Sequence, residues 1–304
     1  MPPPGTVRPP PPGTPSPISV PRLANRRQTI SIPADHVFTV PIKRIVDDAS
    51  LDLWLHSEAF ARLIEFMQTL NDAVRGVRNT AGGEVSETVQ KTLDVLQILD
   101  GWIDEIPPLE SPQRFGNKAF RLWVQRLEES SESLMTSLVP SSRASAIPEL
   151  AGYFAGAFGN GTRIDYGSGH ELSFLAWMCC MDLIDAFGPA DHCVLLTRVF
   201  ARRQTVSPLK CKPEPGNAHV IFPPCPLPSL PKVKNGPFHE HSPMLYDISG
   251  VAQWAKVNTG MLKMYVAEVL RKLPVVQHLP FGSLLPFEEA HEMGPDAGDS
   301  TVQG

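Results

Sequence analysis

The residues best suited to chemistry lie in a glycine-rich stretch, Gly159-Asn-Gly-Thr-Arg-Ile-Asp-Tyr-Gly-Ser-Gly169. Its glycines let a ligand approach the backbone closely, and Arg163 offers a planar fork that suits a phosphate group. The stretch leads into a predicted helix, whose free N–H groups attract anions. The pattern therefore indicates an anion site. It lacks both the G-K-[ST] of a Walker A loop and the preceding strand of a dinucleotide-binding fold.

The same stretch also has a purely structural interpretation. It can be a tight connector in which Arg163 and Asp165 form an ion pair. Glycine patterns of this kind often occur without a ligand, so spacing alone favours the structural interpretation by about two to one. Both interpretations stay open at this point.

Histidines beside carboxylates suggest a second kind of chemistry. His170-Glu171 and His239-Glu240-His241 contain metal-ligating side chains. Neither has the H-E-x-x-H spacing that places two ligands on one helix face. No nucleophile has a credible base near it in the sequence. We therefore predict no metal held by the protein's own side chains, and no catalytic residue can be named by type.

Composition narrows the class of protein. The 304 residues carry a formal net charge of -5, which argues against a non-specific binder of nucleic acid or of anionic membranes. Five cysteines without a C-x-x-C pair predict reduced thiols, three of them in apolar helical sequence. The first residues contain no apolar leader, and the most apolar run, residues 172–187, is too short to cross a bilayer. We expect a soluble protein of the cytosol or nucleus.

Hydrophobic periodicity predicts an all-α fold. Ser57 and Ser86 each precede an apolar stripe at helical spacing and are expected to cap a helix. Ser168 and Glu171 have the spacing of a capping box for a helix that is apolar almost all round and is expected to be central. No alternating pattern predicts a strand before residue 200. The further helices are predicted over residues 117–138, 148–158, 169–187, 191–202 and 257–272.

Three longer stretches resemble the phosphatase 2A activators, also called phosphotyrosyl phosphatase activators. They run from Trp102 to Leu127, from Phe158 to Glu171 and from Gly236 to Pro286. The first contains Trp-Ile-Asp-Glu-Ile-Pro-Pro and the second contains the glycine-rich stretch. The third begins Gly-Pro-Phe-His-Glu-His-Ser-Pro and ends with Gln-His-Leu-Pro-Phe-Gly-Ser-Leu-Leu-Pro. The resemblance implies an all-helical core around a deep pocket.

The resemblance also implies a function. Members of that family bind the catalytic subunit of type 2A-like serine/threonine phosphatases and help to activate it, using ATP and magnesium. They are also described as peptidyl-prolyl cis-trans isomerases, a reaction that twists an amide and needs no nucleophile. The implied ATP contacts are Arg163, Ser168, Gly169, Gln277 and His278. The implied partner-binding residues are Glu240, Gly260 and Met264.

The resemblance divides the chain into segments. A proline-rich tail, expected to be disordered, is followed by a helical core in two parts, which a proline-rich segment outside the family pattern interrupts. An acidic tail, also expected to be disordered, ends the chain. In this order the segments are residues 1–28, 29–202, 203–234 (interrupting the core), 235–287 and 288–304.

Residues 203–234 stand where the family carries a long, mostly helical stretch that includes its lid. A splice variant or an error of gene prediction would explain the abrupt change. Loss of the lid predicts exposed apolar faces and weakened ATP binding. Two alternatives follow: an active isomerase and activator, or a lid-deficient chain that only binds the phosphatase, without isomerase or ATP-dependent activity.

Overall fold

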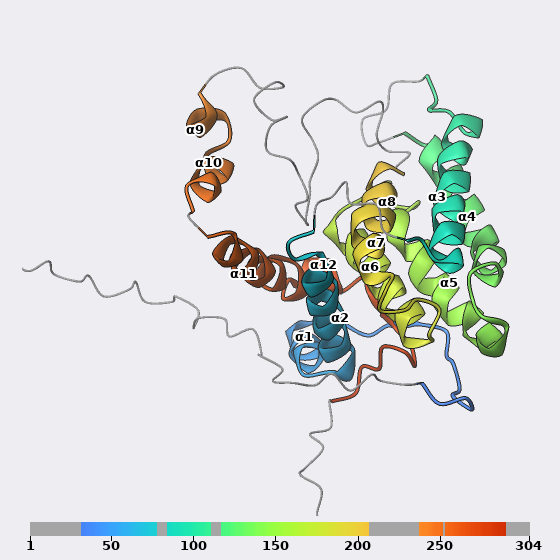
Figure 1. The fold of residues 1–304 in the computed structure, drawn as a ribbon. Coiled ribbons are helices and arrows are strands. Elements are labelled where there is room, and N and C mark those ends of the chain that lie inside the picture. Colours follow the sequence, from blue (N-terminus) through green and yellow to red (C-terminus); the bar gives the residue numbers. More distant parts are fainter. Residues whose placement is uncertain (1–31, 78–83, 111–116, 207–236, 252, 290–304) are drawn as a thin grey trace, which may run out of the picture.

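The computed structural model describes residues 32–77, 84–110, 117–206, 237–251 and 253–289. These residues are mostly helical, which confirms the all-α class (Figure 1). The two strands among them are two residues long each. β1 (Ile42–Lys43) pairs antiparallel with β2 (Pro280–Phe281), and Ile42 lies opposite Phe281. The sequence did not predict β1, because two residues are too few to show an alternating pattern.

Within the described residues, the N-terminal half is built from four helices, and side chains cap the first three of them. α1 (Asp48–Leu55) leads into α2 (Glu58–Val74), and α3 (Glu87–Glu105) precedes α4 (Ala119–Thr136). The Ser57 hydroxyl accepts a hydrogen bond from the Phe60 N–H at 3.1 Å, and Ser86 accepts one from the Val89 N–H at 3.3 Å. Both predicted caps are therefore confirmed.

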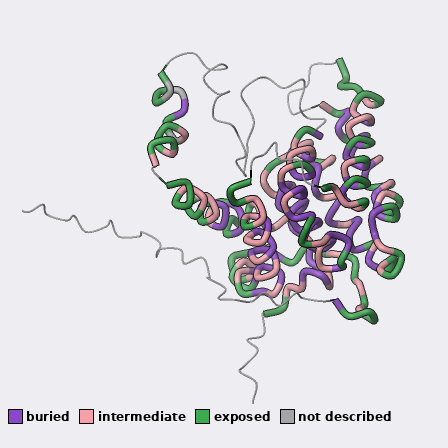
Figure 2. Tube along the Cα trace, viewed as in Figure 1, coloured by how far each residue is buried: buried purple, intermediate pink, exposed green. Residues whose placement is uncertain are grey.

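The centre of the core is α6 (Ser168–Leu183), which packs against α5 (Ile147–Ala155) and α2. A 3₁₀ helix η1 (Ser141–Ala146) precedes α5, and a second, η2 (Gly156–Phe158), follows it. Every residue from 171 to 181 is buried, so α6 is the central helix that its apolar sequence predicted (Figure 2). Cys179 and Cys180 are free thiols inside it, and burial raises the pKa of both.

One continuous helical run follows α6 and extends past the predicted end of the first core segment. It consists of α7 (His192–Val194), the π-helical η3 (Leu195–Phe200) and α8 (Ala201–Thr205). Arg203 and Val206 are buried. Residues 203–206 therefore pack with the helical core, and the rest of the proline-rich segment lies outside the described residues.

The C-terminal part returns to the core through α11 (Trp254–Tyr265), the π-helical η5 (Val266–Leu270) and α12 (Leu273–Val276). The short helices α9 (Phe238–His241) and α10 (Pro243–Ser249) stand beyond α11, at the end of the molecule away from α3 and α4 (Figure 1). Of the predicted tails, only Glu288 and Glu289 are described, and the Glu288 carbonyl accepts a hydrogen bond from the Glu58 N–H at 3.0 Å.

A buried carboxylate fixes the return of the chain. Glu149 on α5 is 1% exposed and accepts hydrogen bonds from the Thr39 N–H at 3.1 Å, the Ser283 hydroxyl at 2.6 Å and the Leu284 N–H at 2.7 Å. These bonds satisfy a charge that would otherwise be costly to bury. They hold the segment after α12 against α5, the helix that leads through η2 into the glycine-rich stretch. Within the described residues, no helix combines the length and apolarity needed to cross a membrane.

Candidate functional site

The glycine-rich stretch forms a closed loop between η2 and α6. The Asn160 N–H donates to the Asp165 carbonyl at 3.0 Å, and the Ile164 N–H donates to the Asn160 carbonyl at 2.8 Å. Gly159 has φ +126, and a Cβ there would lie 2.5 Å from Phe120 Cζ. Ile164 has φ +55, an uncommon conformation for a β-branched residue. The two backbone hydrogen bonds hold this conformation, so the loop has one defined shape.

Arg163 is tied to the loop by its own side chain. Its Nε donates to Asp165 Oδ2 at 2.7 Å and its Nη2 donates to Asp165 Oδ1 at 3.2 Å. Partial burial of Asp165 tends to raise the pKa of its carboxyl group, but the hydrogen bond and charge of Arg163, helped by His170, lower it overall. The structural interpretation of this pair is thus confirmed. Arg163 nevertheless keeps 41% of its side chain exposed.

The helix start differs from the predicted capping box. The N-cap of α6 is Gly167 in an extended conformation, and Ser168 is the first helical residue. Glu171 does not cap the helix, because its side chain is buried and accepts a hydrogen bond from the Tyr166 hydroxyl at 3.1 Å. No side chain caps this terminus. Its first N–H groups are therefore available to solvent or to an anion, and the Ser168 hydroxyl is not used as a cap.

The C-terminal motif lies beside this helix start. α12 packs on α6, and a Cβ on Gly169 would lie only 3.1 Å from the Val275 carbonyl. Gln277 is the C-cap of α12, and its side chain donates to the Pro274 carbonyl at 3.2 Å. Burial lowers the pKa of His278, and the charge of Arg163 lowers it further. The structure thus brings the predicted ATP residues of the glycine-rich loop and of the C-terminal motif into one neighbourhood, although they are far apart in the sequence.

His170 belongs to this neighbourhood, although the sequence did not single it out for this role. Its Nδ1 lies 2.7 Å from the Gly156 carbonyl and therefore carries a proton. Its Nε2 lies 3.7 Å from Asp165 Oδ1, and its ring stacks on Tyr166 with the centroids 5.8 Å apart. Burial is the main cause that lowers the pKa of His170. At neutral pH the imidazole is therefore uncharged.

The predicted partner-binding residues are only partly brought together. Gly260 and Met264 lie one turn apart on α11 and are both exposed. A Cβ on Gly260 would meet no atom within 4 Å, so this part of the helix is open. Glu240 lies on the separate helix α9, where its carboxylate is 3.8 Å from His239 Nε2.

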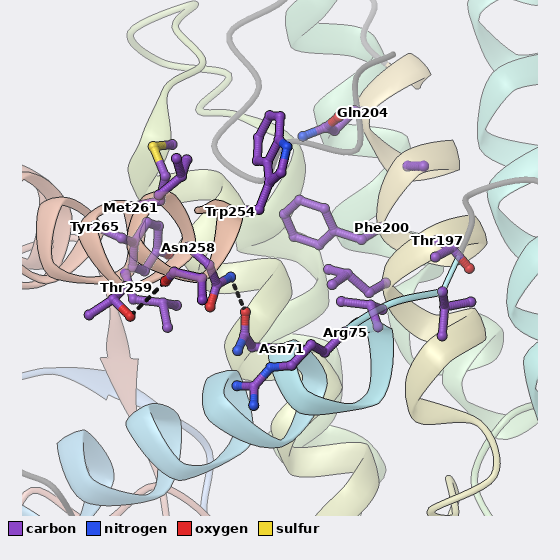
Figure 3. Close-up of a pocket in the computed structure, with 17 residues that line it drawn as sticks. Asn71, Arg75, Thr197, Phe200, Gln204, Trp254, Asn258, Thr259, Met261 and Tyr265 are labelled. Carbon is purple, nitrogen blue, oxygen red and sulfur yellow. Dashed lines mark hydrogen bonds between the residues drawn. The ribbon is translucent and has the colours of Figure 1, made fainter. Parts of the chain in front are cut away.

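A cavity of about 550 Å³ lies between the end of α2, the η3–α8 run and α11 (Figure 3). Phe200 and Leu262 contribute to its apolar lining, and Trp254 at its edge is 62% exposed. On one wall the Asn258 Nδ2 donates to Asn71 Oδ1 at 2.5 Å. None of the eight predicted ATP and partner residues lines this cavity. The charged groups and the uncapped helix start lie at the loop, which is therefore the candidate anion site.

In the described part of the chain, no three His, Cys, Asp or Glu side chains gather into a group that could hold a metal ion. Asp165 is a partly exposed carboxylate of the loop itself, whereas the Glu171 side chain is buried. The residues therefore fit an anion better than a free cation.

Comparison with known proteins identifies similar proteins along most of the chain. The sequence model described as "Phosphotyrosyl phosphate activator (PTPA) protein" matches residues 41–207 and 227–287. A probable serine/threonine-protein phosphatase 2A activator 1 of Dictyostelium discoideum is 33% identical over 303 residues, covering 83% of this chain and 92% of its own. Serine/threonine-protein phosphatase 2A activator 1 of Schizosaccharomyces pombe is 34% identical over 300 residues, covering 82% and 91%.

A solved structure shows the same fold. The crystal structure of the PP2A phosphatase activator Ypa1 PTPA1 superimposes with a TM-score of 0.73 at 29% sequence identity. The match covers 86% of this chain and 100% of that one. The family model, the similar sequences and the similar structure all belong to phosphatase activators. The chain therefore belongs to the phosphotyrosyl phosphatase activator family.

Proposed function

We propose that this chain activates type 2A serine/threonine phosphatases by acting on their catalytic subunit as a peptidyl-prolyl cis-trans isomerase, with ATP and magnesium as cofactors. The observation that carries the proposal is the family match over residues 41–207 and 227–287. Relatives of similar length are named as activators of phosphatase 2A. The site geometry supports a nucleotide as the cofactor.

The loop and the start of α6 would hold the phosphates. The free N–H groups of Ser168 and Gly169 and the fork of Arg163 offer donors to an anion. Gln277 and His278 border the same place. Arg163 must share its donors between Asp165 and the ligand, which weakens binding. Bound nucleotide would supply phosphate oxygens for magnesium, since Mg²⁺ in such sites is held largely by phosphates and water.

Isomerisation requires an apolar slot and a polar group rather than a nucleophile. Desolvation of the X–Pro amide and a donor to its twisted form lower a barrier of ~18–20 kcal/mol. The cavity between α2 and α11 has an apolar lining, and Asn71 and Asn258 place amide groups on its wall. Its apolar lining suits a proline-containing segment.

A second candidate function is binding of the phosphatase without isomerase or ATP-dependent activity. It is favoured by a specific observation: Asp165 already accepts hydrogen bonds from Nε and Nη2 of Arg163, on one side of the guanidinium that a phosphate would otherwise use. In this case the open face of α11 at Gly260 and Met264 would hold the catalytic subunit. The matched family residues leave out 208–226, within the proline-rich segment.

Two assays on the purified chain distinguish these functions. Co-elution with the phosphatase catalytic subunit on size exclusion tests binding, and exchange spectroscopy of an Ala-Pro peptide tests isomerisation. The first proposal predicts both signals. Co-elution without acceleration of isomerisation would favour the binding-only function, and failure of co-elution would contradict both.

Mass spectrometry of the native source tests the proline-rich segment itself. Trypsin should release the peptide over residues 211–232, because proline protects Lys212 from cleavage. Detection would establish a translated chain with this segment. Detection of a family-like helical stretch in its place would assign the segment to an error of gene prediction.

A further inference from the structure

Arg203 on α8 is a buried cation that the proposed function does not use. It is 1% exposed, and its guanidinium lies over the rings of Tyr166 at 4.7 Å and Phe158 at 5.2 Å. Burial alone lowers its pKa to about 9, so it remains charged at neutral pH. Among the described residues it forms no ion pair with a carboxylate. Burying a charge without a counter-charge is costly, so its donors must have a compensating role.

The donors of Arg203 reach both ends of the glycine-rich loop. Nη2 donates to the backbone carbonyl of Ala157, which precedes the loop, and Nη1 donates to the side-chain hydroxyl of Tyr166, near the end of the loop. Nε has no hydrogen-bond partner within the described part of the chain. A single planar group thus connects the backbone before the loop to a side chain near the end of the loop. The rigid fork of arginine suits this role better than the single ammonium of lysine.

Tyr166 transmits this contact to the start of α6. Its hydroxyl accepts from Arg203 and donates to Glu171 Oε1 at 3.1 Å. Its ring stacks on His170, whose Nδ1 donates to the Gly156 carbonyl at 2.7 Å. Tyr166 therefore links Arg203 to two residues in the first turn of α6, Glu171 by a hydrogen bond and His170 by ring stacking.

The neighbouring arginine has a different role. Arg202 points to α3, where its Nη2 donates to Asp100 Oδ2 at 2.8 Å and to Gln97 Oε1 at 2.9 Å. Its other hydrogen bond goes to the Thr205 hydroxyl on α8, and its side chain is partly buried. The two adjacent arginines of α8 therefore offer a matched pair, one on the loop and one away from it.

We propose that Arg203 is a positioning residue that clamps the two ends of the glycine-rich loop and so holds Arg163 and the start of α6 in the geometry of an anion site. The effect on nucleotide binding rests on the function proposed above. The effect on the loop itself does not, because it follows from the contacts of Arg203 alone.

Hydrogen exchange followed by mass spectrometry tests the clamp in the full chain. The variants are Arg203→Met, which keeps an apolar stem without donors, and Tyr166→Phe, which keeps the ring without the hydroxyl. We expect amide exchange in peptides covering residues 157–167 to rise about tenfold in Arg203→Met and less in Tyr166→Phe. Arg202→Met, the matched control, should leave exchange in these peptides unchanged.

Thermal unfolding separates positioning from general support. Because Arg203 is a buried charge without a counter-charge, Arg203→Met should keep the unfolding temperature close to that of the wild type while the loop exchanges faster. Unchanged exchange in both variants would overturn the clamp. If Arg203→Met does not fold, unchanged loop exchange in Tyr166→Phe overturns it alone.

Calorimetric titration with magnesium ATP tests whether Arg203 affects nucleotide affinity. If the wild type binds, affinity should fall in Arg203→Met and stay unchanged in Arg202→Met, and equal affinity in all three would contradict the functional half of the proposal. If the wild type does not bind, the nucleotide function fails. The exchange data still decide whether Arg203 clamps the loop.

Discussion

Arg163 and Asp165 face each other across a single residue and share two hydrogen bonds, Nε to Oδ2 at 2.7 Å and Nη2 to Oδ1 at 3.2 Å. The positive charge of Arg163 is thus paired with a carboxylate from the same loop. An incoming phosphate must therefore compete with Asp165 for Arg163. Both side chains are more than a third exposed, so water screens their attraction and the competition is weak enough to be overcome.

Removing the competing acid should strengthen anion binding. In Asp165→Asn the Arg163 fork is no longer neutralised, and we expect the affinity for magnesium ATP to rise about three- to tenfold. Stability should change by less than about 1 kcal/mol, because the pair is exposed. Calorimetric titration measures the first effect and thermal unfolding the second.

Glu87→Gln is the control for this variant. It removes the carboxylate of another exposed ion pair, with Lys91 on α3, away from the loop. It should leave nucleotide affinity unchanged. Weaker binding in Asp165→Asn than in the wild type would show that Asp165 itself takes part in binding, and our placement of the phosphate would be wrong.

The shape of the loop depends on Gly159. In Gly159→Ala the new Cβ would lie 2.5 Å from Phe120 Cζ and 2.9 Å from the Asp165 carbonyl, at φ +126. We expect the free energy of unfolding to fall by about 2 kcal/mol or more. Chemical denaturation measures the loss.

Gly167→Ala provides the matched comparison within the same loop. Its backbone is extended, with φ -163, and a Cβ there meets nothing within 4 Å. Its stability should stay within about 0.5 kcal/mol of the wild type. Equal losses in the two variants would contradict the conformation of the loop.

Acid should weaken the fold through His170. Its pKa is lowered in the folded state, mainly by burial, so the unfolded chain takes up the proton first as the pH falls. The stability that the neutral imidazole contributes is present above the unfolded pKa of about 6.5 and is lost as the pH falls through the lower folded value. Denaturation midpoints at pH 7.5 and 5.5 should therefore differ less in His170→Gln than in the wild type.

His56→Gln serves as the reference variant. It removes an imidazole whose side chain is 67% exposed. Its two midpoints should differ as much as those of the wild type. A pH response of His170→Gln identical to the wild type would contradict the neutral, buried state of His170.

The open face of α11 should carry the phosphatase contact. Gly260→Asp places a carboxylate where no atom lies within 4 Å, so the fold should be unaffected while a partner surface there would be disrupted. We expect binding of the catalytic subunit to fall at least about tenfold. Surface plasmon resonance measures this.

Gly101→Asp is the matched control, since Gly101 is also a helical glycine with nothing within 4 Å of its Cβ position, on α3. It should bind like the wild type. If Gly260→Asp binds equally well, the partner surface lies elsewhere on the molecule.

The helical fold could be predicted from sequence because its signals are local. Ser57 and Ser86 cap their helices as predicted, and the apolar sequence of α6 places it in the centre. The predicted capping box of Ser168 and Glu171 was wrong, because a capping box requires the Glu171 side chain to turn back toward the helix start. The Glu171 side chain instead accepts a hydrogen bond from Tyr166, a contact that the capping-box pattern does not consider.

The residues of the candidate site were predicted in part from sequence, and their role in binding stays a prediction. Arg163 and Gly169 followed from the loop pattern, and Gln277 and His278 from the family resemblance. Arg203 was missed because it lies past the predicted end of the core, and its burial depends on α8 continuing to Thr205. The cavity beside α11 was missed for a similar reason, since it is formed by residues from three distant segments.

The most direct test of the proposed function is reactivation of an inactive phosphatase 2A catalytic subunit by the purified chain with magnesium ATP. We predict that serine/threonine phosphatase activity rises with added chain, and that the rise is smaller in Gly260→Asp and unchanged in Gly101→Asp. A catalytic subunit that binds the chain but gains no activity would contradict the activator function and leave binding alone.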